Sequence, residues 1–396
     1  MKLLYICHRF PYPPNKGCKI RAFHTIEHLA KHHDVWCATF VDDPADMQYV
    51  PAMKEFCREV VAIPLDRLRA TVRGAFDMAI DETLTEGFYR SRAMRDAICE
   101  LTSRVKFDGV VVFSSSMGQY ARSIDAGIKI IDLCDLDSQK WAAMANRARA
   151  PRSWFYDAEA RRLAQLEAEL YYAFDATILI SKQEADDWIG DRSKLHVMGN
   201  GVDCPTNARG GICETKTIGF VGDMRYIPNV DAVCWFAESI LPTIQMLEPD
   251  ATFRIVGRSP TRRVRQLEER RGVQVTGEVD DVVEELNQCQ VVVAPLRIAR
   301  GVQNKVLEAL AARKAVIVTS PVAHALNASA DEHLVVADDP ASIAARAVEL
   351  LKDPLRCVEF GANAHRWIVR EFRWSQQLGV LDRILTPTCA TNLQIA

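Results

Sequence analysis

Short apolar runs alternate along the chain with longer stretches in which apolar residues recur every three or four positions. Runs of four to eight β-branched residues are typical of buried strands, and the longer stretches are typical of the helices that cover them. The pattern predicts strands over residues 2–7, 34–40, 59–65, 108–114, 128–134, 176–181 and 194–199, and then over 217–223, 252–257, 273–277, 290–295, 315–320 and 333–337. This alternation predicts an α/β fold built on parallel sheets.

A stretch rich in glycine and polar residues, 201–216, divides this pattern into two halves and predicts a linker. The 396 residues are enough for two domains. We therefore expect two doubly wound, Rossmann-like domains that face each other across a cleft, the first over 1–200 and the second over 217–370. In such sheets, ligands bind beyond the carboxyl ends of the strands.

Composition excludes several classes of function. The chain is 48% hydrophobic and 26% charged, which is typical of a globular protein, and its net charge of −3 gives no general attraction to nucleic acid. Its twelve cysteines form no C-x-x-C pair, which argues against zinc and suits a reducing compartment. The first apolar run is too short for a signal peptide, and no run is long enough for a membrane span, so we expect a cytoplasmic protein.

The sequence RGVQNKVLE at 300–308 carries the most informative chemistry. It follows a buried strand, and we expect residues 297–302 to form a loop and a helix to start near Gln303 or Asn304. Free N–H groups in the first turn of a helix bind phosphate, and Gly301 allows a ligand to approach the backbone closely. Lys305 and Glu308 lie three residues apart, on one helix face. The set suits a nucleoside diphosphate, although a solvated Lys–Glu pair on a surface helix is the ordinary alternative.

Several stretches, taken in order, resemble one enzyme family. They are FPYPPNKGCKIRAFHTIEHLAKHHDV, DATILISKQEADDW, KLHVMGNGVD, TIGFVGDMRYIPNVDAVCWFAESILP, VQVTGEVDDV and APLRIARGVQNKVLEALAARKAVIVTS. Together they resemble the retaining nucleotide-sugar glycosyltransferases of family four (group 1), which have the GT-B fold. PPNKG and IDLCDLDSQKW are most similar to sugar transferases associated with exosortase (PEP-CTERM) systems. By the same resemblance, residues 371–396 supply a helix that packs back on the N-terminal domain.

The resemblance implies donor-binding roles in the second domain. Glu308 matches the glutamate that binds the donor ribose, and Lys305 matches a lysine that binds the donor diphosphate, beside the backbone at Gly301 and Val302. Arg300 stands where the family has the first glutamate of the motif, which leaves open how the donor sugar's hydroxyls are held.

Three further positions are implied around these. Arg225 resembles a second phosphate-binding cation, or it is a surface arginine. Gly277 and Val279 match backbone positions that hold the base, with a β-turn as the alternative.

The resemblance also implies roles in the first domain. Gly17 matches a glycine whose backbone nears the donor phosphate, with a plain turn as the alternative; Lys19 and Arg21 are left open between cleft and solvent. The family's histidine after the strand at 128–134 is replaced by Cys134, and Asp135 or Asp137 is expected to contact acceptor or donor sugar. A helix N-cap at Asp137 or Ser138 is the alternative.

The implied activity is retaining transfer of a sugar from a UDP- or GDP-linked donor to a glycan or lipid-linked acceptor, in exopolysaccharide or other surface glycan biosynthesis. Lys305, Arg225 and Asp135 are the candidate catalytic residues, and we expect no cofactor, no metal ion and no nucleic acid. Two clusters that mix arginine with aromatic or aliphatic residues, 65–76 and 147–162, leave open a peripheral contact with the inner face of the plasma membrane. Solvated helix faces are the alternative.

Three other functions remain as alternatives. A nucleotide-sugar epimerase of the same fold would need its own acid and base, for which Asp132, Asp135 and Asp137 are candidates without a matching histidine pair. An NAD-dependent oxidoreductase is disfavoured because no G-x-G-x-x-G follows a strand. A non-catalytic nucleotide-sugar-binding protein is compatible with the missing glutamate and histidine, but Lys305 and Glu308 argue against it.

Overall fold

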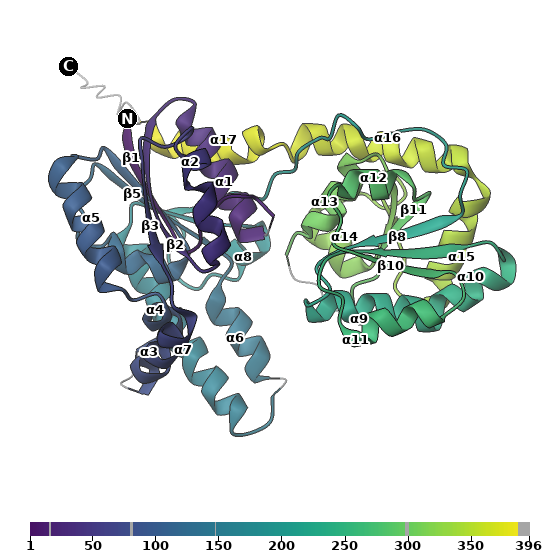
Figure 1. Ribbon diagram of the computed structural model, residues 1–396, viewed down its shortest axis with the longest axis horizontal. Helices are drawn as coiled ribbons and strands as arrows, with labels where there is room; N and C mark the ends of the chain where they lie inside the picture. Colours follow the sequence, from purple (N-terminus) through teal and green to yellow (C-terminus); the bar gives the residue numbers. More distant parts are fainter. Residues whose placement is uncertain (16, 80–81, 147, 298–300, 387–396) are drawn as a thin grey trace, which may run out of the picture. The chain divides into compact units, whose positions relative to one another are not determined.

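The computed structural model describes residues 1–15, 17–79, 82–146, 148–297 and 301–386, and it forms two compact units (Figure 1). The first unit contains Met1–Gly199 and the chain from Leu378 on, and the second contains Asn200–Gln377. The second unit therefore includes the stretch 201–216 that was expected to be a linker. Both units are doubly wound α/β structures with parallel sheets, as the hydrophobic pattern predicts.

The first unit is built on a seven-stranded sheet in the order β3-β2-β1-β4-β5-β6-β7. Its strands are β1 (Lys2–Cys7), β2 (Asp34–Val41), β3 (Glu59–Pro64), β4 (Gly109–Phe113), β5 (Ile128–Cys134), β6 (Ala176–Leu179) and β7 (Leu195–Val197). Its helices are α1 (Gly17–Ala30), α2 (Val50–Met53), α3 (Arg67–Ala79), α4 (Leu84–Phe88), α5 (Arg92–Arg104), α6 (Asp137–Ala145), α7 (Arg152–Ala173) and α8 (Lys182–Asp186), with 3-10 turns η1 (Pro44–Tyr49) and η2 (Ser115–Tyr120).

The second unit is built on a six-stranded sheet in the order β10-β9-β8-β11-β12-β13. Its strands are β8 (Thr217–Val221), β9 (Thr252–Val256), β10 (Val273–Gly277), β11 (Val291–Ala294), β12 (Ala315–Val318) and β13 (Val335–Val336). Its helical segments are α9 (Ile227–Trp235), the π-helical η3 (Phe236–Ile240), α10 (Leu241–Leu247), α11 (Arg262–Arg265), η4 (Gln266–Glu269), α12 (Val282–Asn287), α13 (Asn304–Ala311), α14 (Ser320–Leu326), α15 (Pro340–Lys352) and α16 (Pro354–Glu371). Helix α17 (Trp374–Leu385) starts in this unit and ends in the first.

The central strands explain why the hydrophobic pattern is informative. Every residue of β4, β8, β11 and β12 is buried, because helices cover both faces of each sheet. In the second unit, α10 and α15 pack together on one face while α13 and α16 pack together on the other (Figure 1). All thirteen expected strands are present, each within a few residues of its expected range.

A buried ion pair fixes the first helix of the first unit to its sheet. The Arg21 guanidinium donates to both carboxylate oxygens of Asp132, with Nε–Oδ2 2.7 Å and Nη2–Oδ1 3.0 Å, and both side chains are almost fully buried. Arg21 also donates to the carbonyl oxygens of Met198 and Gly199, where the first unit's main segment ends. Arg21 is therefore structural in the first unit, and faces neither solvent nor an open site.

Replacing Arg21 by alanine should lower the free energy of unfolding of the first unit by about 3–5 kcal/mol, because it leaves the Asp132 carboxylate buried without its cation. Urea unfolding followed by tryptophan fluorescence measures the loss. Arg92→Ala is the matched control, since Arg92 is 93% exposed and its contact with Asp96 is 3.6 Å long. Equal losses for the two variants would contradict the structural role of Arg21.

Candidate functional site

Chain topology selects one edge of the second unit. The chain runs from β8 outward through β9 and β10, then returns to β11 on the other side of β8 and continues to β12 and β13. The carboxyl ends of β8 and β11 therefore flank the point at which the direction of winding reverses. Connections leave such a point to opposite faces of the sheet, so a ligand finds open space there. The loop after β8 carries Arg225, and the loop after β11 leads into α13, whose first turn carries Lys305.

The loop after β11 leads into α13 as expected. Helix α13 begins at Asn304, with Gln303 as its N-cap residue and no side-chain cap on its first N–H groups. Gly301 has a φ of 61°, in the left-handed region that favours glycine, and Val302 packs against the apolar core. The side chain of Gln303 thus does not cap the first backbone N–H groups of α13. Arg300 lies outside the described residues.

Lys305 is partly buried in the first turn of α13. Its ammonium donates to Oδ1 of Asn229 and lies 5.6 Å from the ring centre of Phe220, a residue of β8. Asn229 in turn donates from Nδ2 to the carbonyl oxygen of Asp223, at 2.9 Å. Burial lowers the pKa of Lys305 to about 8, although nearby Glu308 acts in the opposite direction. The side chain is thus a cation held in place by Asn229, in the first turn of α9.

Glu308 follows one turn later and is also partly buried. Among the residues that the structure describes, no hydrogen-bond donor contacts its carboxylate, and no ion pair shorter than 4.0 Å joins it to Lys305. Burial raises the pKa of Glu308 to about 7, against the opposing effect of Lys305. A carboxylate that is partly withdrawn from water and has no protein donor among the described residues is typical of a group that binds a ligand.

The loop after β8 carries a charged cluster. Asp223 accepts hydrogen bonds from Arg225 (Nη2–Oδ2 3.2 Å) and Arg258 (Nε–Oδ2 3.0 Å), and also from the backbone N–H of Arg225. Partial burial would raise the pKa of Asp223, but these bonds outweigh it and lower the pKa to about 2. The Arg225 side chain is 60% exposed, so its guanidinium is held by Asp223 and is still accessible to an anion.

Glycines at the ends of β8, β9 and β10 bring the backbone of these strands close together. A Cβ on Gly257 would lie 1.7 Å from the carbonyl oxygen of Gly222, so no larger residue fits there. Gly277 has a φ of 77° and its carbonyl oxygen accepts from the N–H of Gly257, at 3.0 Å. Val279 follows, partly buried against the core. Gly277 and Val279 thus lie at the same carboxyl edge as Arg225 and Lys305.

In the first unit, the direction of winding reverses between β1 and β4. Gly17 starts α1 just after β1 and is exposed, with an ordinary φ. Lys19 is buried and its ammonium lies 2.6 Å from Oδ2 of Asp46. Neither Lys19 nor Arg21 is available to a ligand, because each is already paired with a buried carboxylate.

Asp135 lies at the carboxyl end of β5, beside the lysine of the next helix. Lys140 Nζ lies 2.7 Å from Asp135 Oδ2 and 3.2 Å from Asp137 Oδ1. The expected N-cap at Asp137 or Ser138 is wrong: the cap residue of α6 is Leu136, and Ser138 instead donates to the buried carboxylate of Glu167. Because α6 begins at Asp137, both side chains lie inside the helix and not at the capping position.

Three residues that the sequence reading did not select gather at the end of β1 and β2. Among the described residues, His8 Nδ1, Arg9 Nε and Asp42 Oδ1 are buried atoms without a hydrogen-bond partner. Arg9 Nε lies 3.5 Å from Asp42 Oδ2, and the His8 ring packs on Tyr89 and Phe113. Burial, with a further effect of Arg9, lowers the pKa of His8 to about 4, so the imidazole is neutral at pH 7. The available signal was that His8 and Arg9 directly follow β1, which flanks the reversal point, and that Asp42 directly follows the neighbouring β2.

Within the described ranges, no three His, Cys, Asp or Glu side chains gather closely enough to hold a metal ion, and a metal-free site remains a prediction. No helix in the described part of the chain is long and apolar enough to cross a bilayer.

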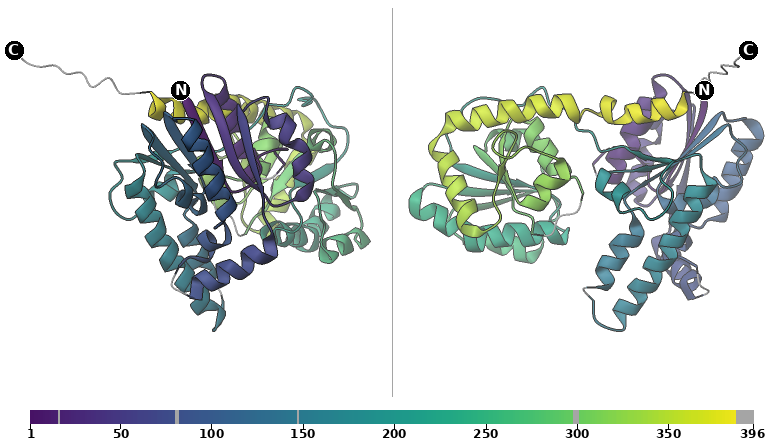
Figure 2. Two further views of the ribbon diagram at one scale, coloured as in Figure 1. Left: turned by 60° about the vertical axis from the view of Figure 1, so that its left-hand side comes forward. Right: turned by 180° about the vertical axis from the view of Figure 1, so that it is seen from behind.

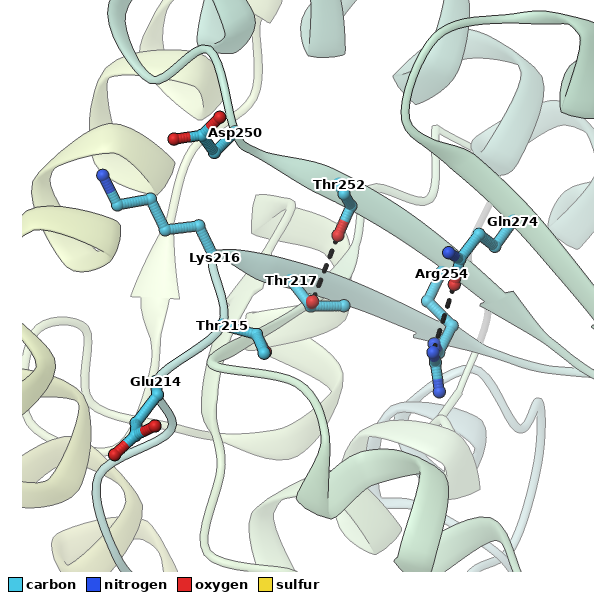
Figure 3. Close-up of a pocket in the computed structure, with 8 residues that line it drawn as sticks. All are labelled: Glu214, Thr215, Lys216, Thr217, Asp250, Thr252, Arg254 and Gln274. Carbon is cyan, nitrogen blue, oxygen red and sulfur yellow. Dashed lines mark hydrogen bonds between the residues drawn. The ribbon is translucent and has the colours of Figure 1, made fainter.

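A shallow pocket of about 480 Å³ lies at the other edge of the second sheet (Figure 3). It is formed at the amino ends of β8 and β9, where Thr217 and Thr252 share a hydrogen bond of 3.1 Å. Arg254 points across it and donates to Gln274, at 3.1 Å. Because this edge lies opposite the carboxyl ends of the strands, the pocket shares no residue with the candidate site.

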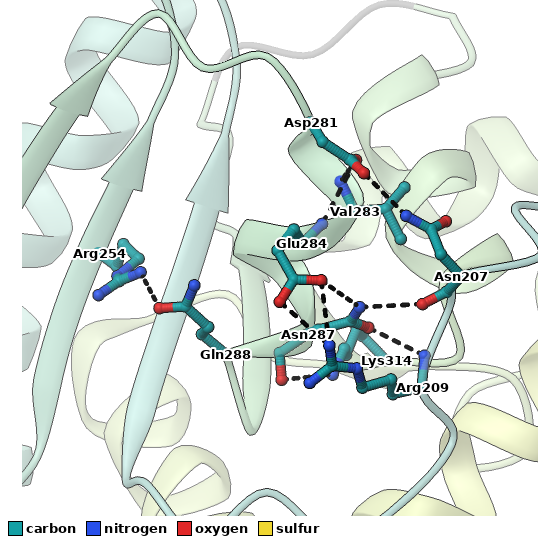
Figure 4. Close-up of polar contacts among 9 residues, drawn as sticks. All are labelled: Asn207, Arg209, Arg254, Asp281, Val283, Glu284, Asn287, Gln288 and Lys314. Carbon is teal, nitrogen blue, oxygen red and sulfur yellow. Dashed lines mark hydrogen bonds and ion pairs between the residues drawn. The ribbon is translucent and has the colours of Figure 1, made fainter.

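Polar contacts beside this pocket explain why the second unit starts at Asn200 (Figure 4). Asn207 donates to Asp281, at 2.8 Å, and its carbonyl oxygen accepts from Asn287, at 3.0 Å. The N–H of Arg209 donates to Oδ1 of Asn287 at 2.9 Å, and its guanidinium pairs with Glu284. The stretch expected to be a linker is thus fastened to α12.

Comparison with known proteins adds a family model and a fold. Residues 215–353 match the model described as "Glycosyl transferases group 1", and this range contains every residue of the second unit's candidate site. No curated protein matches the chain in sequence.

Solved structures match almost the whole chain. TarM, from S. aureus, has a TM-score of 0.70 at 10% identity over 97% of this chain and 98% of its own. HepE from Anabaena, in complex with UDP, has a TM-score of 0.67 at 11% identity over 97% and 99%. Sucrose-phosphate synthase from Thermosynechococcus elongatus has a TM-score of 0.67 at 15% identity over 97% and 98%. These likenesses show the fold: the chain has the two Rossmann-like domains of the GT-B glycosyltransferases, which confirms the expected fold class.

Burial of Glu308 predicts a pH-dependent cost to stability. The pKa of Glu308 is raised from 4.5 to about 7. The stability that the protonated carboxyl group gives to the fold is therefore complete below pH 4.5 and is lost as the pH rises through 7. Glu308→Gln should therefore melt at the same temperature as the native protein near pH 4.5. At pH 7.5 it should melt at a higher temperature, because its free energy of unfolding is higher by about 1–3 kcal/mol. Glu238→Gln, at a more exposed helical position, should show no such trend. A difference that is constant with pH would contradict the buried state of Glu308.

Proposed function

We propose that the protein transfers a sugar, with retention of configuration, from a nucleoside-diphosphate sugar to a glycan or lipid-linked acceptor in the synthesis of a surface glycan such as an exopolysaccharide. The observation that carries the proposal is the Lys305–Glu308 pair at the reversal point of the second sheet. Its cation is held in place and its carboxylate has no donor among the described residues. The family model matched by 215–353 and the UDP bound by the HepE structure support the same class of donor.

The donor diphosphate is assigned to the start of α13. Donors and positive charge meet there: the first N–H groups of α13, the Lys305 ammonium and the backbone at Gly301 and Val302. Arg225, held by Asp223, supplies a second cation from the β8 loop. These groups would stabilise the negative charge that develops on the diphosphate as its bond to the sugar breaks. Each would lower the activation barrier by roughly 2–4 kcal/mol.

The nucleoside is assigned to Glu308 and to the ends of β9 and β10. The Glu308 carboxylate would accept hydrogen bonds from the two ribose hydroxyls, which supply the donors that it lacks in the free protein. The backbone at Gly277 and Val279 would hold the base, and the donor is UDP- or GDP-linked. Arg300 stands where the glycosyltransferase family that this chain resembles has a glutamate. We assign Arg300 to binding of the donor sugar.

In the proposed reaction the acceptor hydroxyl attacks the face from which the diphosphate departs. A phosphate oxygen accepts the proton of that hydroxyl, so no side-chain base is needed. Asp135, paired with Lys140, is proposed to orient sugar hydroxyls in place of the family's histidine. Gly17 is assigned to the donor phosphate. The first unit's neutral His8, with Arg9 and Asp42, offers polar atoms to the acceptor.

The test is turnover of UDP- and GDP-sugars by the purified protein, with and without glycan acceptors. Glu308→Ala and Lys305→Ala should each lower kcat/KM by about 100-fold or more without lowering the melting temperature at pH 7.5, because both groups bind the ligand and neither holds the fold together. Glu238→Ala is the matched control and should retain full activity.

Product configuration, read by proton NMR, should match that of the donor. A parallel loss of melting temperature and activity in Glu308→Ala would assign the residue to the fold instead. Release of an epimerised nucleotide sugar without acceptor would replace the transferase by an epimerase.

A further inference from the structure

Helix α3 exposes its apolar face. Leu68, Val72 and Phe76 follow one another at intervals of four residues, so they form one stripe, and they are 82%, 71% and 64% exposed. The buried positions of the same helix are Ala70 and Gly74, with Asp77 one turn on. This is the reverse of an ordinary surface helix, in which the large apolar residues face the core.

Close packing against α4 fixes which side of α3 faces out. A Cβ on Gly74 would lie 2.8 Å from the carbonyl oxygen of Leu84, so only a residue without a side chain fits between the helices. Arg73 donates to the carbonyl oxygens of Gly87 and Phe88, at 2.9 and 2.8 Å. The helix therefore cannot rotate its apolar stripe inward without losing these contacts.

A second exposed group lies on the neighbouring α6–α7 hairpin. Trp154, at the start of α7, is 72% exposed, and Met144 at the end of α6 is 41% exposed. The hairpin is joined to the α3 region, because Arg162 donates to the carbonyl oxygen of Met78 at 3.0 Å and Glu159 accepts from the N–H of Leu84 at 2.9 Å. Both ribbon views show α3 and this hairpin projecting from the same end of the first unit (Figures 1 and 2).

The charges around these side chains are positive. Arg67, Arg149 and Arg152 are exposed and have no acidic partner among the described residues. The exposed acids nearby are matched: Asp66, just before α3, by Arg69, and on α7 Asp157 by Arg161 and Glu169 by Arg122. A net positive surface with an exposed tryptophan and an aliphatic stripe, on a chain of net charge −3, complements an anionic lipid bilayer. Self-association through this face would bring like charges together.

We propose that the projecting helices α3, α6 and α7 dock the first unit on an anionic bilayer. Leu68, Val72, Phe76 and Trp154 enter the region between headgroups and acyl chains, and Arg67, Arg149 and Arg152 bind the lipid phosphates. The docking surface rests on exposure and charge alone, and so does not depend on the proposed sugar transfer.

Co-sedimentation with lipid vesicles tests the docking surface. The native protein should bind vesicles of phosphatidylcholine with 30% phosphatidylglycerol at least tenfold more tightly than vesicles of phosphatidylcholine alone, and 0.5 M NaCl should weaken the binding. The combined variant Leu68→Ser, Val72→Ser, Phe76→Ser, and separately Trp154→Ser, should each reduce binding at least tenfold. Their melting temperatures should remain native, because these side chains are exposed.

The combined variant Met246→Ser, Leu247→Ser is the matched control, since it removes side chains that are 74% and 57% exposed from α10 of the second unit. Retained vesicle binding in this control supports the proposal. Equal binding to neutral and anionic vesicles, or equal loss in the control, would overturn it. So would a native dimer, seen by light scattering, that the α3 variant converts to a monomer, because the apolar face would then belong to a second copy of the chain.

Discussion

The hydrogen bond from Lys305 to Asn229 connects the first turns of α13 and α9, the two helices on which the candidate site depends. Asn229 also donates to the carbonyl oxygen of Asp223, and Asp223 holds Arg225 and Arg258. The ends of β8 and β11 are thus joined by one chain of polar contacts across the reversal point of the sheet. A cation that is already positioned loses little freedom when an anion binds, which is the physical advantage of this arrangement. The same burial lowers the pKa of Lys305 and raises that of Glu308, so the fold bears a cost that a ligand can relieve.

Much of this could be predicted from the sequence, because strands buried on both faces are continuous apolar runs. β8 and β11 and the start of α13 at Asn304 were expected from such runs. The spacing of Lys305 and Glu308 also placed them on one helix face. Their partners could not be predicted: Asn229 is 76 residues from Lys305 in the sequence, and only the fold brings the two together.

Other features needed the structure because they depend on long-range packing. Nothing in the sequence distinguishes Lys19 and Arg21 from cations on a helix surface. In the structure both are buried, Lys19 paired with Asp46 and Arg21 with Asp132. The residues at the end of β1, His8 and Arg9, are separated from Asp42 by more than thirty positions and carry no motif. Helix α3 shows a different limit: the sequence showed that 65–76 mixes arginine with apolar residues, but the contact of Gly74 with α4 decides which of them face outward.

The central claim, that Lys305 and Glu308 form a nucleoside-diphosphate site, is tested most directly by a thermal-shift panel of UDP, GDP and ADP. A ligand that binds the folded state raises its melting temperature. The account predicts a clear rise with one of the three, lost in Glu308→Ala and kept in Glu238→Ala. No rise with any nucleotide, or a rise that survives in Glu308→Ala, would contradict it.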